Sequence, residues 1–483
     1  MSRPVERSPL AETQAQGAAE KLASEVVILL HGAARAVRLY PPENAAVRKV
    51  VGELGRQCER VLAADRVFDL KRAGDYLFIN ETRLRLGFDN FAAVNAVLRL
   101  LREAAVGTVS LRATPSHHDW VALLSLLNRP DAALPEAERL AAVVAQLGRG
   151  KVTAFGLAPT NEGLEELEEV DAREQSRQIY MRTLNVTREV FKSARVGGTV
   201  GVRTARKALR GVVDQVLKDE GSILGLTTLR DFDEYTYVHC VNVCILAVAL
   251  GRRLGLSKLQ LLDLGLAAVL HDVGKARIPL EILNKRGSLT NEEFDVVRQH
   301  TWKGVLSLMA MPFGGSRPWR AMTVAFEHHQ RVDLSGYPRV RRPRQLSLFS
   351  RIVAVADSFD AATSKRVYRE VTWTPADVLR DMRDTARHGL DPIVVKAFIN
   401  MVGLYPLGTV VVLDSGEVAV VVGVPSDPAQ SARPVVRLVL GPDGTRIAGE
   451  VTIDLASPDA PPRTIVRTED PDRHGIVVTD YTT

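Results

Sequence analysis

Histidines recur at regular intervals through the centre of this chain, and their spacing restricts what that region can fold into. The intervals are about 30 residues long, and the sequence over about 226–401 has a helical pattern with several amphipathic segments. An interval of this length is two helices' worth of chain, so each helical hairpin would return one side chain to the same place, as in bundles that build metal sites. The side chains concerned are His239, His271, Asp272, His300, His328, His329 and Asp357. The alternative, in which each histidine is packed or exposed on its own, is disfavoured by so many candidates in one helical segment.

The chemistry of these side chains narrows the choice of metal. Imidazole and carboxylate donors without thiolate suit Fe, Mn or Zn, and the number of histidines disfavours a pure Mg or Ca site. Asp272 has two carboxylate oxygens, so it could bridge two ions, which an imidazole cannot do. A pair of such ions lowers the pKa of a bridging water and holds a phosphodiester oxygen while the hydroxide attacks phosphorus. The pattern therefore predicts a two-metal phosphohydrolase centre.

The motifs around these ligands resemble those of the HD-GYP family, a branch of the HD metal-dependent phosphohydrolases. The resemblance lies in His271-Asp272-Val273-Gly274-Lys275, in the pair His328-His329 and in Gly336-Tyr337-Pro338, and it covers roughly residues 225–402. It implies an all-α HD-type helical bundle that hydrolyses cyclic di-GMP to pGpG or GMP by means of a bridging hydroxide. It also implies two divalent metal ions, with Fe or Mn favoured and Zn as a further option.

The resemblance implies a role for each residue of the site. The ligands of the HD part would be His239, His271, Asp272 and Asp357. The ligands of the second metal would be His300, His328 and His329, with Asp272 as the bridge. The substrate would be held by Lys275, Gly336, Tyr337, Pro338, Arg366 and Arg369. Lys275 would contact the scissile phosphate and act in catalysis with Asp272, whereas a helix-end charge for the lysine and surface salt bridges for the arginines are the alternatives.

Two positions depart from the family's usual loop. Gln330 stands where the family has Glu after the histidine pair, and Leu334 stands where it has Gly. Neither is a metal ligand, but a β-carbon at 334 changes the backbone freedom of the loop. The alternative function is therefore a weak or inactive HD-GYP module that acts as a nucleotide receptor or protein-interaction adaptor, and a hydrolase for another nucleotide is a third. Members with a third metal carry Glu at the position of Tyr235, so we expect two metals.

The chain as a whole predicts a multidomain protein, because 483 residues exceed one ordinary core. The expected parts are a disordered N-terminus (1–17), an α+β domain open to a regulatory role (18–160), an acidic connector with a long helix (161–224), the HD-GYP bundle (225–402) and a small β-rich subdomain with a loose tail after Ile476 (403–483). The connecting helix could carry a homodimer interface or a signal, or act only as a spacer.

Local patterns place elements inside the outer parts. The expected helices are 18–64, interrupted at 40–42, and 91–105, and the expected strands are 67–71, 76–80, 109–112, 152–156, 410–413, 418–422, 435–440 and 451–455. His117-His118-Asp119 copies the later motifs, but Ser116 before it is typical of a helix N-cap. We therefore expect residues 117–119 to form the first turn of a helix rather than a metal site.

Composition bears on compartment and partners. Three cysteines without a CxxC pair favour a reducing cytoplasm. The net charge of +6 is spread along the chain, which is typical of a solvated surface. No apolar run approaches the roughly 20 residues of a membrane-spanning helix. Nothing resembles a nucleic-acid-binding module, so we expect cyclic di-GMP, with a second copy or a signalling protein as further partners.

Overall fold

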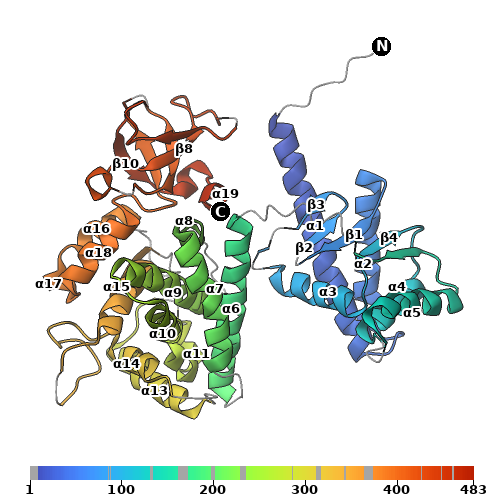
Figure 1. Ribbon diagram of the computed structural model, residues 1–483, viewed down its shortest axis with the longest axis horizontal. Coiled ribbons are helices and arrows are strands. Elements are labelled where there is room, and N and C mark those ends of the chain that lie inside the picture. The colour runs from blue at the N-terminus through green and yellow to red at the C-terminus, as the bar shows by residue number, and fades with distance from the viewer. Residues whose placement is uncertain are drawn as a thin grey trace. The chain divides into compact units, whose positions relative to one another are not determined.

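The computed structural model describes residues 9–482 except 75, 85, 88, 131–133, 161–171, 197–201, 229–234, 286, 312–316, 342–343, 364–373, 426, 448 and 460–461. The chain forms two compact units, Met1–Asp171 and Ala172–Thr483 (Figure 1). No helix within these described ranges combines the length and the apolar character needed to cross a bilayer.

The first unit is an α+β structure built on one antiparallel sheet. Its elements are α1 (Pro9–Leu39), α2 (Ala45–Asp65), β1 (Asp69–Ala73), β2 (Tyr76–Ile79), β3 (Thr82–Arg83), α3 (Phe91–Glu103), β4 (Thr108–Leu111), α4 (His117–Asn128), α5 (Glu136–Arg149) and β5 (Phe155–Ala158). The strand order is β3-β2-β1-β4-β5, and β1 and β2 form the expected hairpin, with Gly74 at a positive φ in the turn. Apolar side chains from helices α1 to α4 and from the sheet share a single core.

Two expectations for the first unit need correction. Helix α1 begins at Pro9 rather than at residue 18, so residues 9–17 are helical instead of disordered. This segment is rich in Ala, Glu and Gln, which favour helix even without an apolar face. The last strand begins at Phe155 rather than at Val152. The amide of Val152 donates to the carbonyl of Leu147, so Val152 closes the end of α5 instead of opening the strand.

The His117-His118-Asp119 segment is the first turn of α4, as expected. Ser116 accepts a hydrogen bond from the amide of Asp119, and the Asp119 carboxylate accepts one from the amide of Ser116. This reciprocal pair is a capping box. The aspartate is therefore used in starting the helix, which accounts for its place in the motif.

The second unit begins with a helical bundle. Its helices are α6 (Ala172–Val196), α7 (Val202–Lys218), α8 (Glu220–Gly225), η2 (Leu226–Thr228), α9 (Tyr235–Arg253), α10 (Lys258–Val269), η3 (Val273–Arg277), α11 (Leu280–Leu283), α12 (Asn291–Arg298), α13 (His300–Ala310), α14 (Trp319–Glu327), α15 (Leu348–Thr363), α16 (Pro375–Met382), α17 (Thr385–His388) and α18 (Pro392–Val402). Helix α9 lies at the centre and contacts α6, α7, α10, α15 and α18. Its residues 241–250 are all buried, which explains why every residue of that stretch except Asn242 is apolar. The sequence assigned α6 and α7 to a connector, whereas in the structure both pack on α9 as part of this unit.

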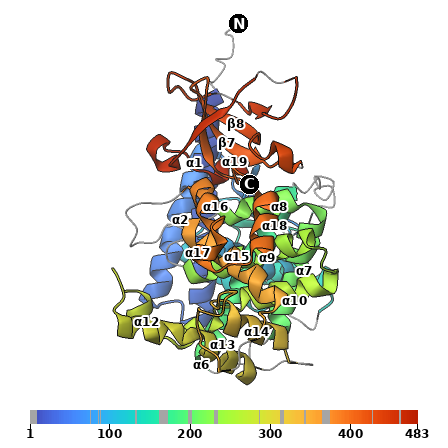
Figure 2. The same ribbon diagram turned by 90° about the vertical axis from the view of Figure 1, so that its left-hand side faces the viewer.

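A second antiparallel sheet follows the bundle. Its strands are β6 (Val410–Leu413), β7 (Val418–Gly423), β8 (Val435–Leu440), β9 (Thr452–Asp454) and β10 (Ile465–Glu469), in the order β10-β6-β7-β8-β9. In Figures 1 and 2 the labelled strands lie at one end of the unit, beside α8 and α16. The sequence missed β10 because it is an edge strand with charged side chains. A short helix, η5 (Pro471–His474), follows β10. The expected loose tail after Ile476 is also corrected, because α19 (Thr479–Thr482) packs on α8 and η2.

Candidate metal centre

The structure brings all seven expected ligands together at the centre of the bundle. His239 comes from α9, His271 and Asp272 from the turn between α10 and η3, and His300 from the first residue of α13. His328 and His329 follow the end of α14, and Asp357 lies on α15. Among the described residues they form two groups, one of His239, His271 and Asp357 and the other of Asp272, His300, His328 and His329, and within each group the candidate ligand atoms lie within 4.8 Å of one another. We call them the His239 group and the His300 group.

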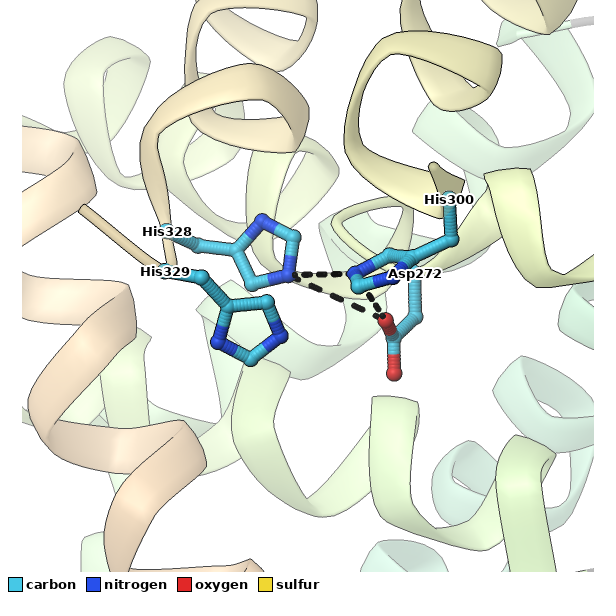
Figure 3. Close-up of side chains that lie close together, drawn as sticks. All are labelled: Asp272, His300, His328 and His329. Carbon is cyan, nitrogen blue, oxygen red and sulfur yellow. Dashed lines mark hydrogen bonds and ion pairs between the residues drawn. The ribbon is translucent and has the colours of Figure 1, made fainter. Parts of the chain in front are cut away.

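Asp272 faces both groups, one with each carboxylate oxygen. Its Oδ2 lies 3.3 Å from Nε2 of His271 and 3.9 Å from Nε2 of His239. Its Oδ1 lies 3.3 Å from Nε2 of His300 and 3.8 Å from Nε2 of His328. Figure 3 shows His300 and His328 turned toward the same oxygen of Asp272 from different segments. The carboxylate therefore has the placement that a bridging ligand needs.

Backbone carbonyls fix the tautomer of three of the histidines. Nδ1 of His271 lies 2.7 Å from the carbonyl oxygen of Ala268, and Nδ1 of His300 lies 2.7 Å from that of Val297. Nδ1 of His328 contacts two carbonyl oxygens at 3.1 Å. A carbonyl can only accept, so each Nδ1 carries the hydrogen and each neutral ring has its lone pair on Nε2. The Nε2 atoms are the ones that point into the two groups.

The donor set fits divalent metal ions. Nε2 of His271 and Oδ1 of Asp272 are buried and have no hydrogen-bond partner among the described residues. The Nε2 atoms of His300 and His328 lie 3.2 Å apart, so two lone pairs face each other. Burial lowers the pKa values of His300 and His328, and it lowers that of His329 to about 3, so these rings are neutral at pH 7. Buried, unpaired lone pairs of this kind are costly unless a cation binds between them.

His239 differs because its ring lies between two carboxylates. Nε2 lies 3.0 Å from Oδ1 of Asp357, and Nδ1 lies 2.7 Å from Oδ2 of Asp360. Burial disfavours the charged form, but the hydrogen bonds to Asp357 and Asp360 outweigh burial and raise the pKa of His239 well above its ordinary value. A proton and a metal ion thus compete for Nε2. Sequence reasoning missed Asp360 as a site residue, although its place three residues after Asp357 puts both on one face of α15.

Lys275 lies beside the Asp272 carboxylate. Its Nζ is 2.5 Å from Oδ2 of Asp272, one turn earlier in the chain. Burial opposes ionisation of Asp272, but Lys275 and His271 hold the pKa of its carboxyl well below the usual range. The ammonium group is therefore close enough to the His239 group to reach an anion there. Arg366 and Arg369, also expected to hold substrate, lie outside the described residues.

The Gly336-Tyr337-Pro338 segment folds back onto the histidine pair. The amide of Tyr337 donates to the carbonyl of His329 at 3.1 Å, and the Tyr337 ring lies 4.7 Å from the His329 ring, centroid to centroid. A β-carbon at Gly336 would come within 2.2 Å of the His329 carbonyl oxygen, so only glycine allows this approach. Gln330, which replaces the family's Glu, donates from Nε2 to the carbonyl of Pro338 at 2.9 Å and so ties the loop down.

Leu334 has the backbone conformation that favours glycine, with φ at +65°. The β-carbon of a left-handed residue costs roughly 1–2 kcal/mol. We therefore expect Leu334→Gly to be more stable than Leu334→Ala by about 1 kcal/mol in the free energy of unfolding. The two variants both lack the leucine side chain, so their difference measured by chemical denaturation isolates the β-carbon. Equal stabilities would contradict strain at this position.

A cavity of 820 Å³ opens beside the His239 group and the His300 group. On one side it is lined by His328, His329 and Asp357, and on another by the loop that carries Tyr337. Helices α12 and α13 complete the wall with Phe294, Asp295, Arg298, Gln299 and Trp302. The candidate ligands are thus reached from a space that is large enough for a nucleotide-sized molecule.

Comparisons with known proteins agree with this site. Residues 214–394 match the sequence model of the HD domain family. The chain is 39% identical over 234 residues to cyclic di-GMP phosphodiesterase PA4108 of Pseudomonas aeruginosa, covering 48% of this chain and 55% of that protein. It is 36% identical over 178 residues to a cyclic di-GMP phosphodiesterase of Thermotoga maritima, covering 36% and 46%. It is 38% identical over 138 residues to 3'3'-cGAMP-specific phosphodiesterase 1 of Vibrio cholerae, covering 28% and 31%. The alignments thus span about half of these relatives or less.

The family match and the metal centre lie in the same part of the chain. All seven candidate ligands, from His239 to Asp357, fall inside the matched residues. The histidine pair and the GYP segment line the cavity, and the HD pair belongs to the two ligand groups beside it. Residues 214–394 of this chain therefore match the HD domain family, and their motifs resemble those of its HD-GYP branch.

Proposed function

We propose that this protein is a metal-dependent phosphodiesterase that hydrolyses cyclic di-GMP to pGpG or GMP. Two divalent ions, Fe or Mn before Zn, would be held by the His239 group and the His300 group. The observation that carries the proposal is the placement of Asp272, whose two oxygens each face the imidazoles of one group. A carboxylate between two clusters of imidazoles is the arrangement that two-metal hydrolases use.

The relatives support the substrate class. The proteins of Pseudomonas aeruginosa and Thermotoga maritima are named cyclic di-GMP phosphodiesterases, and the Vibrio cholerae protein is named for 3'3'-cGAMP. Both substrates are cyclic dinucleotides joined by phosphodiester bonds. A hydrolase for such a molecule needs a metal centre beside a cavity with room for nucleobases, and the two groups of candidate ligands beside the cavity support this requirement.

The residues of the site divide the work of hydrolysis. A bound pair of ions would supply a hydroxide at neutral pH and would neutralise charge on the scissile phosphate. Lys275, held beside Asp272, would contact that phosphate and offset its developing charge. Arg366 and Arg369 would hold phosphate oxygens with their planar donor groups. Tyr337 and Gly336 would close the cavity over the histidine pair.

The rim of the cavity suits a purine base. The guanidinium carbon of Arg298 lies 4.4 Å from the Phe294 ring centroid and 5.5 Å from that of Tyr337, and the two rings meet edge-on, so the guanidinium lies beside two aromatic rings. Arg298 also pairs with Asp295 at 2.9 Å, and both line the cavity. Guanine presents two acceptors, O6 and N7, that match the fork of an arginine. We propose that one guanine of the substrate lies against Arg298.

Removing the Arg298 side chain should weaken substrate binding more than it slows the chemical step. We expect Arg298→Ala to raise KM for cyclic di-GMP by about tenfold, with kcat nearly unchanged, because the contact would be the same in the ground state and the transition state. Arg380→Ala is the matched control, since Arg380 pairs with Asp377 at the same spacing on α16 and is absent from the cavity lining. A fall in kcat with KM unchanged would contradict a base-binding role.

The competing function is a receptor that binds a cyclic dinucleotide without cleaving it. The strained backbone at Leu334, in the GYP loop, is the observation that favours it. A turnover assay separates the two readings: purified full chain, loaded in turn with Mn²⁺, Fe²⁺ and Zn²⁺, is given cyclic di-GMP, 3'3'-cGAMP and cyclic di-AMP. We expect metal-dependent cleavage of cyclic di-GMP. Tight binding with no product under every metal would favour the receptor and refute the hydrolase.

A further inference from the structure

A chain of buried hydrogen bonds leads from the metal ligand His239 to helix α6. Nδ1 of His239 lies 2.7 Å from Oδ2 of Asp360, and the other oxygen of Asp360 accepts a hydrogen bond of 3.0 Å from Nδ2 of Asn242. Oδ1 of Asn242 accepts a hydrogen bond of 2.9 Å from the hydroxyl of Tyr180 on α6. Asp360 is 2% exposed, and Asn242 and Tyr180 are fully buried.

The donors and acceptors in this chain fit in only one direction. Nδ2 of Asn242 faces the Asp360 carboxylate and also the carbonyl oxygen of Thr227 at 3.3 Å, and both of these can only accept. The amide oxygen must therefore face Tyr180, whose hydroxyl donates to it. Asp360, with one oxygen occupied by Asn242, accepts from Nδ1 of His239 with the other. In the neutral ring this leaves the lone pair of His239 on Nε2, toward Asp357 and Asp272.

His239 depends on other elements for its orientation. His271, His300 and His328 are fixed by carbonyls three or four residues earlier in the chain. The partner of His239 is instead a carboxylate on α15, which is itself held by side chains on α9 and α6. Carboxylate partners of this kind orient a ligating histidine and raise its basicity. A change at Tyr180 should therefore alter the orientation of His239 and leave the orientations of His271, His300 and His328 unchanged.

Helix α6 is well placed to control this chain of hydrogen bonds. It lies outside the matched residues 214–394, yet it contacts both α9 and η3. The Phe191 ring packs edge-on against the Tyr237 ring at 5.5 Å, and Nε of Arg195 donates to the carbonyl of Ala276 at 3.3 Å. The helix is thus fixed along the metal centre, with Tyr180 as its polar contact to Asn242.

We propose that Tyr180, Asn242 and Asp360 are positioning residues for His239, and that α6 sets how tightly the His239 group binds its divalent cation. This inference rests on the proposed function, because it requires a cation at that group. By this inference, α6, which lies outside the HD match, affects cation binding at the His239 group. It does not affect the His300 group.

The test is a calorimetric titration of the metal-free full chain with Mn²⁺. The parent chain should show two binding steps, and His239→Ala should remove one of them. Asp360→Asn should weaken that same step by about 10–100-fold, the usual effect of losing the partner of a ligating histidine. Tyr180→Phe, which removes one hydroxyl, should weaken it by about tenfold, the lower end of that range. The step that survives in His239→Ala should be unchanged in both variants.

Thr187→Val is the matched control. Thr187 lies two turns further along α6, is buried, and donates its hydroxyl to the carbonyl of Thr183 at 2.8 Å, outside the chain to His239. Its loss should leave both steps unchanged, and thermal unfolding of the metal-free variants should show that each is folded. A Tyr180→Phe titration equal to the parent, or one in which both steps weaken alike, would overturn this proposal alone. Failure of the parent chain to bind Mn²⁺ would overturn the proposed function as well.

Discussion

Replacing Asp272 with asparagine is expected to reduce the turnover of cyclic di-GMP by about 10³-fold or more. The two oxygens of this buried carboxylate face separate groups of imidazoles, at 3.3 Å from His271 and 3.3 Å from His300. Asparagine keeps the side-chain volume but loses the negative charge. It also replaces one carboxylate oxygen with an amide nitrogen, which has no lone pair available for a cation. A bound metal supplies several kcal/mol of transition-state stabilisation, which corresponds to at least three orders of magnitude in rate.

Metal content should change together with activity. The parent chain should hold two Mn²⁺ ions, whereas Asp272→Asn should hold at most one after the same loading and desalting. Asp214→Asn is the control for loss of a carboxylate, because Asp214 is half exposed and pairs with Lys258 on the surface of the same unit. Full turnover by Asp272→Asn, or two ions retained in it, would refute the bridging role.

Replacing Gly274 with alanine is expected to cause the largest loss of stability among the substitutions considered for the site. A β-carbon at Gly274 would lie 1.9 Å from the carbonyl oxygen of His300 and 2.4 Å from the amide nitrogen of Gly304. The backbones of η3 and α13 therefore touch at this glycine, and an added methyl group must push them apart. We expect a loss of about 3 kcal/mol or more in the free energy of unfolding, above the usual range for overpacking because the contacts are to backbone.

The same change should weaken metal binding, because α13 begins with His300 and η3 follows Asp272. Chemical denaturation of the metal-free protein measures the stability, and Mn²⁺ titration measures the binding. Gly221→Ala is the matched control, since Gly221 is an exposed helical residue of the same unit whose nearest contact would be Asp219 Oδ1 at 3.7 Å. Stability of Gly274→Ala equal to that of Gly221→Ala would show that η3 and α13 are not tightly apposed.

The clustering of the candidate ligands could be predicted from sequence because their chemistry and their spacing agree. Imidazoles and carboxylates at intervals of two helices indicate a bundle site, and the structure places all seven in two adjoining groups. Asp272 has one oxygen toward each group, which agrees with the expectation that a carboxylate could face two sites. In contrast, Asp360 and Asn242 look like ordinary helical polar residues, since Asp360 contacts His239 and Asn242 from 121 and 118 positions away, and Tyr180 contacts Asn242 from 62 positions away. Only folding reveals contacts of that range.

The outer elements show the same limit. The β1–β2 hairpin and the capping box at Ser116 were predictable because a few adjacent residues determine them. Helices α6 and α7 were recognised as helical, but their sequence does not say which neighbour their apolar faces cover. Strand β10 carries charged residues and pairs with β6, whose own residues lie about 50 positions earlier. The hydrogen bonds to β6, rather than the residue composition of β10, determine that this segment is a strand.

The entry of α6 into the bundle has a practical consequence for cutting this protein into fragments. A fragment trimmed to the family match, 214–394, would lose α6 and most of α7. The removed segments bury Tyr180, Leu184, Leu209 and Val212 against the remaining helices, so their loss would leave an apolar face open to water and an amide at Asn242 with one partner fewer. Fragments meant to report on the metal centre should therefore start at or before Ala172, ahead of the helix that completes it.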